Sequence, residues 1–339
     1  MANQKTDLYV CHTAYQVLIA LVRALRAGGG QSLVLSTVLP NAEPLADRLA
    51  ETGAFAEVRL VNESACPGIA LGPFLQHTRN RRQFERLCGL KLHRGQYAHV
   101  YICNDWSVLG RYLQDCHLPY ILCEDTLGGT LDPDQHLLAA QRAEAGFAGR
   151  QRRGEGYLYW GDANCVAAVE SEDAAKCRLF PAKKLVTFSK AALLQSLTGE
   201  EKAAVRAVFI TRPLPDAAAA AGATLLLPRS FVEDGLMTQP EQNALFRAVA
   251  ARYAPAGTPL FIKTHPRDAT DYAALFPGAV VLDRAMPGEV LNFCLPFRFR
   301  RAVTVQSWVL RGFTAAEEPV FLSLDEARAL AGQAARPVL

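Results

Sequence analysis

The chain reads Pro-Leu-Phe-Ile-Lys-Thr-His-Pro-Arg-Asp over residues 259–268. The first half of this stretch is the largely apolar run of a buried strand, and the second half is a polar turn. In open α/β sheets, ligands bind at the carboxyl ends of the strands, which is where this turn belongs. His265 stands between Lys263 and Arg267, a setting that suits an anionic group such as a phosphate. Taken alone, the stretch also fits a surface turn with a solvated histidine.

Short apolar runs alternate with helical patterns on both sides of this stretch. Strands are predicted at residues 7–11, 32–36, 57–61, 99–103, 120–123, 224–227, 259–263, 279–282, 302–305 and 320–322. Helices are predicted at residues 15–26, 45–51, 79–87, 106–115, 241–252, 287–293 and 307–313. This order indicates α/β architecture, with parallel sheets and helices on both faces. Residues 151–177 break the rhythm, and we interpret them as an irregular or antiparallel excursion.

The two strand–helix series are separated by residues 211–222, where prolines and five successive alanines are typical of a linker or a short helix. Domains are therefore expected at residues 1–216 and 222–339. Two Rossmann-like domains facing each other across a central cleft are the GT-B type of fold. A doubly wound single domain and a two-domain binding protein are the alternatives, because a fold does not determine a function.

Composition narrows the classes of protein. Of 339 residues, 50% are hydrophobic and 20% are charged, which is typical of a globular protein, and the formal charge of +3 is too small to indicate nucleic-acid binding. The nine cysteines include no CxxC pair, and no apolar run reaches membrane-spanning length. A cytoplasmic protein with reduced cysteines is expected. P-loop, GxGxxG, HExxH and GxSxG motifs are absent, which argues against kinases, nicotinamide enzymes, zinc proteases and serine hydrolases.

Three more polar clusters follow predicted strands. Residues 124–129 read Glu-Asp-Thr-Leu-Gly-Gly. The adjacent carboxylates are expected to repel each other, which would raise the pKa of one toward that of a general base. The glycines have no side chain, so the backbone there can approach a ligand closely. Residues 229–235 read Arg-Ser-Phe-Val-Glu-Asp-Gly, a weaker signal because Asp-Gly is a common turn. Residues 304–307 read Thr-Val-Gln-Ser and are expected to open a helix whose N-terminus binds phosphate. An acidic turn and a simple N-cap are the structural alternatives.

Together, these clusters resemble those of the bacterial lipooligosaccharide sialyltransferases, glycosyltransferase family 52. The counterparts of the family's motifs are the acid pair Glu124 and Asp125, the pair His265 and Pro266, and residues 304–307. Residues 9–16, Tyr-Val-Cys-His-Thr-Ala-Tyr-Gln, are similar to the family's first strand and turn. One departure is that Thr126 stands where the family has a glycine directly after the acid pair.

The resemblance implies transfer of sialic acid from CMP-sialic acid to a galactose-type hydroxyl of a lipooligosaccharide or capsular glycan, with inversion. It implies an acceptor-side first domain and a donor-side second domain. His265 would assist the departing phosphate, and the base would be Asp234, which we favour, or else Glu124 or Asp125. Residues expected at the donor are Thr13, Gly128, Lys263, Pro266, Arg267, Thr304, Gln306 and Ser307. Neither a metal nor another cofactor is expected.

Other functions also fit this sequence. The donor sugar could be another CMP-linked ulosonic acid of the Kdo type or an NDP-hexose, whereas a GT-B epimerase is less favoured by the resemblance. A non-catalytic protein that binds nucleotide sugars during surface-glycan assembly is the alternative from a different class. Expected partners are the nucleotide-sugar donor and the glycan acceptor, without nucleic acid. Peripheral contact with the inner face of the cytoplasmic membrane, and a homodimer, are left open.

Overall fold

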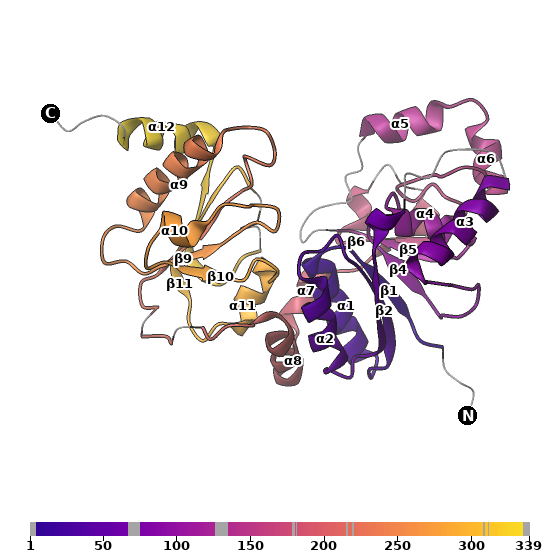
Figure 1. Ribbon diagram of the computed structural model, residues 1–339, viewed down its shortest axis with the longest axis horizontal. Coiled ribbons are helices and arrows are strands. Elements are labelled where there is room, and N and C mark those ends of the chain that lie inside the picture. Colours follow the sequence, from indigo (N-terminus) through magenta and orange to yellow (C-terminus); the bar gives the residue numbers. More distant parts are fainter. Residues whose placement is uncertain are drawn as a thin grey trace. The chain divides into compact units, whose positions relative to one another are not determined.

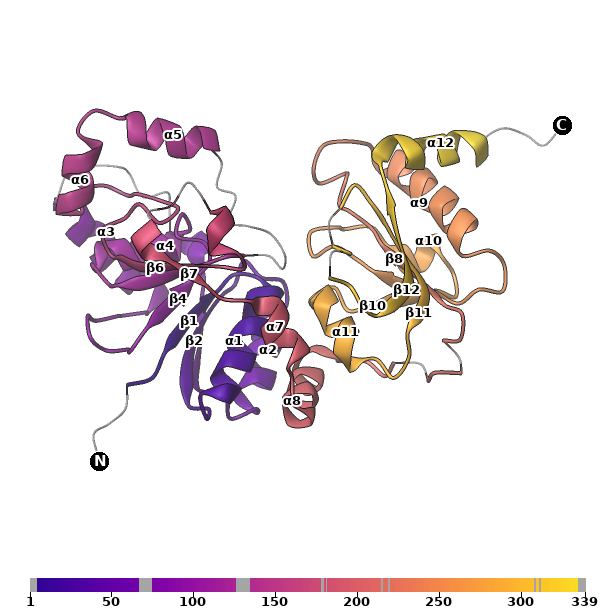
Figure 2. The ribbon, with the colours of Figure 1, turned by 180° about the vertical axis from the view of Figure 1, so that it is seen from behind.

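A computed structural model describes residues 5–66, 75–125, 135–177, 180, 182–214, 216–218, 220–307, 309–310 and 312–334. The chain divides into two compact units, Met1–Glu201 and Lys202–Leu339. Each unit is a parallel sheet with helices packed against it (Figures 1 and 2). The boundary between the units lies within a helix, some way before the expected linker at residues 211–222.

Unit 1 contains a sheet of seven strands, all pairs of which are parallel. Its spatial order is β3 (Phe55–Val61), β2 (Gln31–Ser36), β1 (Leu8–Cys11), β4 (Val100–Ile102), β5 (Tyr120–Cys123), β6 (Val166–Ser171) and β7 (Leu185–Thr187). Strand β1 lies in the interior of the sheet and is fully buried, with Leu8 opposite Ser32 on one side and Val100 on the other. Burial on both faces explains why it reads as a continuous apolar run.

The helices of unit 1 cover both faces of this sheet. They are α1 (Ala14–Arg26), α2 (Ala42–Ala50), α3 (Leu75–Cys88), α4 (Val108–Asp115), α5 (Gln135–Ala143), α6 (Phe147–Arg153), α7 (Lys190–Gln195) and α8 (Gly199–Phe209), which crosses into unit 2. Short 3₁₀ turns occupy Glu63–Ala65, Ala174–Lys176 and Ala182–Lys184. Helices α1 and α2 lie on one side of the sheet and α3 and α4 on the other (Figures 1 and 2). On α1, Val17, Leu18 and Leu21 are fully buried, as expected of its apolar stripe.

Unit 2 contains a sheet of five parallel strands. Its order is β10 (Val280–Leu282), β9 (Leu260–Lys263), β8 (Thr224–Leu227), β11 (Phe299–Val305) and β12 (Ala316–Leu322). Its helices are α9 (Gln239–Tyr253), α10 (Tyr272–Leu275), α11 (Leu291–Cys294), which follows a 3₁₀ turn at Gly288–Val290, and α12 (Leu324–Ala334). Helix α9 begins at a capping box formed by Thr238 and Glu241 and packs beside α12 (Figure 1).

The predicted strands and helices are confirmed except at two places. For residues 151–177 the antiparallel alternative is wrong, because β6 continues the parallel sheet and pairs with β5 and with β7, a strand the sequence did not predict, whereas residues 154–165 are irregular as the other alternative expected. The helix expected at residues 307–313 is also wrong, since the described residues 307, 309–310 and 312–313 form turns or irregular backbone. Gln306 has a left-handed φ of 47° and turns the chain directly after β11. None of the helices in the described ranges combines the length and the apolarity that crossing a membrane requires.

Strand order reverses direction at one point in each sheet. In unit 1 the chain moves outward from β1 to β3 and then returns to place β4 on the other side of β1. In unit 2 it moves from β8 to β10 and returns to place β11 beside β8. At such a point the loops after neighbouring strands diverge and leave a crevice at their carboxyl ends. Functional residues are therefore expected at these two sheet edges.

We expect Gly110→Ala to destabilise unit 1. A Cβ at this position in α4 would lie 2.3 Å from the backbone oxygen of Asp105, a separation that real structures do not show. Relief requires backbone movement, at a cost of about 2–3 kcal/mol, or a fall in Tm of roughly 5–10 °C. Thermal unfolding followed by circular dichroism measures this fall. Gly199→Ala is the matched control, because a Cβ there meets nothing within 4 Å, and an equal fall in both variants contradicts the interpretation.

Candidate functional site

The turns after β8, β9 and β11 gather the polar side chains of unit 2 at one sheet edge. Because these strands are parallel neighbours, their carboxyl ends meet there. The turn after β8 brings Ser230 and Asp234, the turn after β9 brings His265 and Arg267, and Gln306 follows β11. Residues more than 30 positions apart in the sequence thus contact one another, as the strand–turn pattern predicted.

His265 is half-buried and is held by its Nδ1 atom. Nδ1 accepts a hydrogen bond from the backbone N–H of Arg267 at 3.2 Å and lies 3.3 Å from the hydroxyl of Ser230. Burial, reinforced by the charges of Arg267 and Lys263, lowers the pKa of His265 below its ordinary value. The ring is therefore neutral at pH 7. Since Nδ1 is an acceptor, we assign the ring proton to Nε2, which makes no hydrogen bond within the described residues.

Asp234 lies between two arginines. Its Oδ2 is 3.0 Å from Nε of Arg229, and its Oδ1 is 2.9 Å from Nη2 of Arg267. The hydrogen bond from Arg229, joined by that from Arg267, holds the pKa of Asp234 below its ordinary value. Arg229 also donates from Nη1 to the carbonyl of Gln306, so it links the turns after β8 and β11. Asp234 is thus ionised at neutral pH and is surrounded by cations that an anionic ligand can also contact.

Two residues expected at the donor instead make hydrogen bonds within the sheet framework. Lys263 is buried and donates from Nζ to the carbonyls of Thr264 at 2.7 Å and Arg284 at 3.2 Å, and burial lowers its pKa to about 8. Thr304 is fully buried, and its hydroxyl donates to the carbonyl of Leu227 in β8. In this conformation both side chains hold backbone segments of the edge in place.

The remaining residues expected at the donor differ in exposure. Pro266 and Gln306 are exposed, and Ser307 is partly exposed, with its Oγ accepting from the backbone N–H of Val309 at 3.3 Å. The described residues 307, 309–310 and 312–313 contain no helix, so they do not supply the backbone donors that a helix N-terminus would offer to a phosphate. Arginine guanidinium groups and the histidine are consequently the main cationic and donor groups of this edge.

At the corresponding edge of unit 1, Gln16 joins the ends of three strands. Its Oε1 accepts from the backbone N–H of His12 after β1, and its Nε2 donates to Asn104 after β4 and to Asp125 after β5. Thr13 is the N-cap of α1, and its hydroxyl accepts from the N–H of Gln16 at 3.2 Å. Capping is therefore the role that the structure gives to the Thr13 hydroxyl.

Glu124 and Asp125 have different surroundings. Glu124 is 2% exposed, and its Oε2 accepts from the backbone N–H of Glu172 and from the hydroxyl of Ser171. Its other oxygen, Oε1, has no hydrogen-bond partner among the described residues, and burial raises the pKa of Glu124. Asp125 is half-buried. Gly128, expected at the donor, lies outside the described residues.

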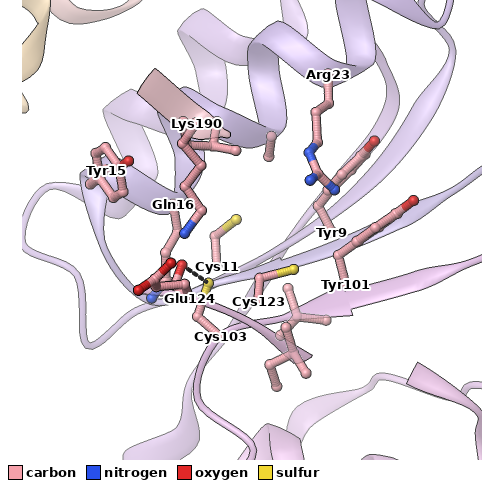
Figure 3. Close-up of a pocket in the computed structure, with 14 residues that line it drawn as sticks. Tyr9, Cys11, Tyr15, Gln16, Arg23, Tyr101, Cys103, Cys123, Glu124 and Lys190 are labelled. Atoms are coloured by element: carbon pink, nitrogen blue, oxygen red, sulfur yellow. Dashed lines mark hydrogen bonds between the residues drawn. The ribbon is translucent and has the colours of Figure 1, made fainter. Parts of the chain in front are cut away.

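A pocket of about 30 Å³ opens beside Glu124 (Figure 3). Figure 3 shows Lys190, Gln16 and Glu124 gathered at one end of it, and Arg23 with two tyrosines at the other. Lys190 is 2% exposed, and its Nζ has no hydrogen-bond partner among the described residues. The space holds about two water molecules or one sugar hydroxyl group. A buried ammonium and a buried carboxylate oxygen, both unsatisfied, are thus ready for a group that accepts from one and donates to the other.

Sequence reasoning did not select four residues that the structure places at these edges. Ser230 and Arg229 lie in a cluster that it noted, but only Asp234 was chosen from that cluster. Gln16 has the signal that a polar residue occupies the buried first turn of α1. Lys190 is more than 60 residues from Glu124, and its only sequence signal is a lysine directly after the N-cap of α7.

Sequence comparison with known proteins finds similarity over a short segment of the chain. No family model matches the chain. An uncharacterized protein of Haemophilus influenzae is 35% identical over 83 residues, which is 24% of this chain and 26% of that protein. The chain's match thus spans about a quarter of the length of this relative.

Solved structures match over nearly the whole chain. An α/β-galactoside α-2,3-sialyltransferase of Photobacterium phosphoreum superposes with a TM-score of 0.53 at 11% identity, covering 97% of this chain and 94% of that one. The UDP-GlcNAc 2-epimerase of Methanocaldococcus jannaschii gives 0.50 at 10% identity over 97% and 91% of the two chains. MnaA of S. aureus with UDP gives 0.50 at 11% identity over 94% and 79%. The chain therefore has the two-domain, Rossmann-like GT-B fold.

Proposed function

We propose that this protein is an inverting glycosyltransferase that moves sialic acid from CMP-sialic acid to a galactose-type hydroxyl of a surface glycan. The observation that carries the proposal is the cluster after β8 and β9, in which His265, Arg229, Arg267 and Asp234 lie together at the point where the strand order of unit 2 reverses. GT-B folds serve several nucleotide-sugar chemistries, so the proposal rests on these residues and not on the fold.

The unit 2 cluster has the groups needed to release a phosphate leaving group. As the bond to CMP breaks, negative charge grows on the phosphate, and the anomeric carbon gains oxocarbenium character. The neutral ring of His265 donates from Nε2, while the guanidinium groups of Arg229 and Arg267 supply two fixed positive charges. Such preorganised donors stabilise the transition state because they need no reorientation when the charge develops.

We assign the general base to Asp234. The arginines keep it ionised, so it can accept the proton of the attacking hydroxyl, although their hydrogen bonds weaken it as a base. An anionic donor competes for the same arginines. Once the phosphate or the sugar carboxylate lies beside Arg229 and Arg267, its negative charge offsets theirs, so the pKa of Asp234 rises and the base becomes stronger. Donor binding thereby prepares the base before the acceptor reacts.

Unit 1 supplies the acceptor side in this proposal. Glu124 and Lys190 hold one sugar hydroxyl, which accepts from the ammonium and donates to the free carboxylate oxygen. Asp125, fixed by Gln16, offers a further acceptor at the half-exposed edge of the same sheet. Peripheral contact with the inner membrane and formation of a homodimer are further expectations, on which the proposed reaction does not depend.

Release of CMP from CMP-sialic acid by the purified protein, with and without lactose, tests the proposed function. Release that lactose stimulates establishes the transferase. Conversion of UDP-GlcNAc to its 2-epimer would instead favour an epimerase, whose fold the chain shares. Turnover of CMP-Kdo or an NDP-hexose alone would change the donor. Tight CMP binding without any turnover would favour the non-catalytic protein.

Activity is expected to survive chelation of divalent metals. Two arginines and a histidine provide charge and hydrogen bonds for the phosphate, so the proposed site does not need a cation to neutralise it. We expect the initial rate in EDTA to stay within about twofold of the untreated rate. Removal of a group that is essential to catalysis would instead lower the rate by about 10²-fold or more. Loss of activity that magnesium or manganese restores would contradict this expectation and favour an NDP-hexose donor.

A further inference from the structure

A second pocket of unit 1 lies away from the sheet edge described above. It has a volume of about 500 Å³ and is lined by residues of α3, the C-terminal end of α4 and the segment after α3. Helix α4 starts near the carboxyl end of β4 and runs for eight residues, so its C-terminal end is about 12 Å along the helix from that edge. The pocket is large enough for a small molecule and is not part of the candidate active site.

The floor of this pocket is a buried polar network. Nδ1 of His77 lies 2.5 Å from Oδ1 of Asp115, and the hydroxyl of Tyr157 donates to the same oxygen at 2.8 Å. Nε2 of His77 accepts from the backbone N–H of Gly156, so the proton on Nδ1 points to Asp115 and the ring is fixed. The other oxygen of Asp115, Oδ2, is buried and has no hydrogen-bond partner among the described residues. The floor thus needs a hydrogen-bond donor.

The rim of the pocket carries two cations that form no ion pair within the described residues. Arg81 is paired with Glu85 at 2.8 Å. Arg82 and Lys91 are exposed and form no ion pair within the described residues, and His117 is exposed beside them. Thr78 adds a hydroxyl from the first turns of α3. The two free cations and these polar groups suit a doubly charged anion.

We propose that this pocket binds a phosphate monoester on a hydroxyl-bearing group, such as a sugar or glycerol phosphate. The separation of charge orients the ligand: Arg82 and Lys91 hold the phosphate at the rim, and a ligand hydroxyl donates toward Asp115 at the floor. A phosphate at the floor would be repelled by that carboxylate. A free metabolite and a lipid headgroup share this chemistry. The proposal stands independently of the glycosyl transfer.

Calorimetric titration of the full chain with glycerol 3-phosphate, in about 150 mM salt to screen distant charges, tests the site. Arg82→Ala with Lys91→Ala is expected to weaken binding by tenfold or more, because it removes two charged hydrogen-bond donors. The matched control is Arg79→Ala with Arg86→Ala, which removes the same charge from exposed positions of α3 that do not line the pocket. The control should bind as the wild type does. Equal weakening in both double variants, or no binding by the wild type, overturns the proposal.

Two further probes test the role of the ligand's hydroxyl group and the source of the ligand. Ethyl phosphate lacks the extra hydroxyls, so it should bind several-fold more weakly than glycerol 3-phosphate, and equal affinity overturns the role assigned to Asp115. Vesicles containing phosphatidylinositol 4-phosphate present a phosphate monoester on the hydroxyl-bearing ring of a lipid headgroup. Binding to these vesicles that glycerol 3-phosphate displaces identifies a headgroup as a source, and binding of the soluble ester alone identifies a free metabolite.

Discussion

His265→Ala is expected to lower kcat for sialyl transfer by about 10²–10⁴-fold, the usual cost of removing a general acid or a donor to the leaving group. The wild-type ring is held by the N–H of Arg267, and in the proposed reaction its Nε2 proton is donated to the leaving phosphate. Alanine keeps the turn but removes that proton. Single-turnover release of CMP measures the loss at the chemical step. His93→Ala, an exposed histidine on the other unit, is the control and should be fully active.

The pH dependence distinguishes how His265 acts. Burial and the neighbouring cations lower its pKa below the ordinary value, so rising pH removes the ring's charge before neutrality is reached. If the neutral ring donates a hydrogen bond, the rate should stay level from about pH 6.5 to 8. If the imidazolium were the reacting acid, the rate would fall with rising pH, and this fall would begin below pH 6.5. Near-normal turnover by His265→Ala at every pH would sink the assignment.

Much of the fold was predictable because parallel sheets bury strands on both faces. Strands β5 and β8 occur at the predicted residues, since their short apolar runs sit between clear polar turns. Strand β6 was missed because Val-Ala-Ala-Val-Glu-Ser is only partly buried and has low β-propensity. The helix predicted after β11 is not found among the described residues 307, 309–310 and 312–313, which follow the left-handed Gln306, and a hydrophobic pattern does not report such local backbone conformations.

The site was predictable as a set of turns but not as a set of contacts. Polar residues after β8 and β9 do meet, because neighbouring parallel strands end at one edge. The direction of each side chain is decided by packing, and so Lys263 and Thr304 bond to backbone carbonyls. Lys190 reaches the pocket of Glu124 through the pairing of β5 with β6 and of β6 with β7, a chain of contacts that local sequence does not specify.

Asp234→Asn is expected to lower kcat by about 10³-fold, whereas Glu124→Gln should cost less than about tenfold. The two substitutions are matched, since each replaces a carboxylate by an amide of the same shape. Asparagine cannot accept the proton of the acceptor hydroxyl, but glutamine at position 124 still accepts through its carbonyl oxygen from the backbone N–H of Glu172. Steady-state kinetics with lactose as the varied acceptor compares them. The reverse ranking would move the base to unit 1.

The division between kcat and KM shows whether Asp234 reacts or only positions its arginines. If it is the base, Asp234→Asn lowers kcat while KM for CMP-sialic acid changes little, because Arg229 and Arg267 remain to bind the donor. If it only positions the arginines, the asparagine releases them, and KM rises at nearly constant kcat. Arg267→Ala is the complementary variant: removing one cation raises the pKa of Asp234 and weakens donor binding, so KM should rise more than kcat falls. A selective loss of kcat in Asp234→Asn, with the opposite pattern in Arg267→Ala, would separate the base from the groups that bind the donor.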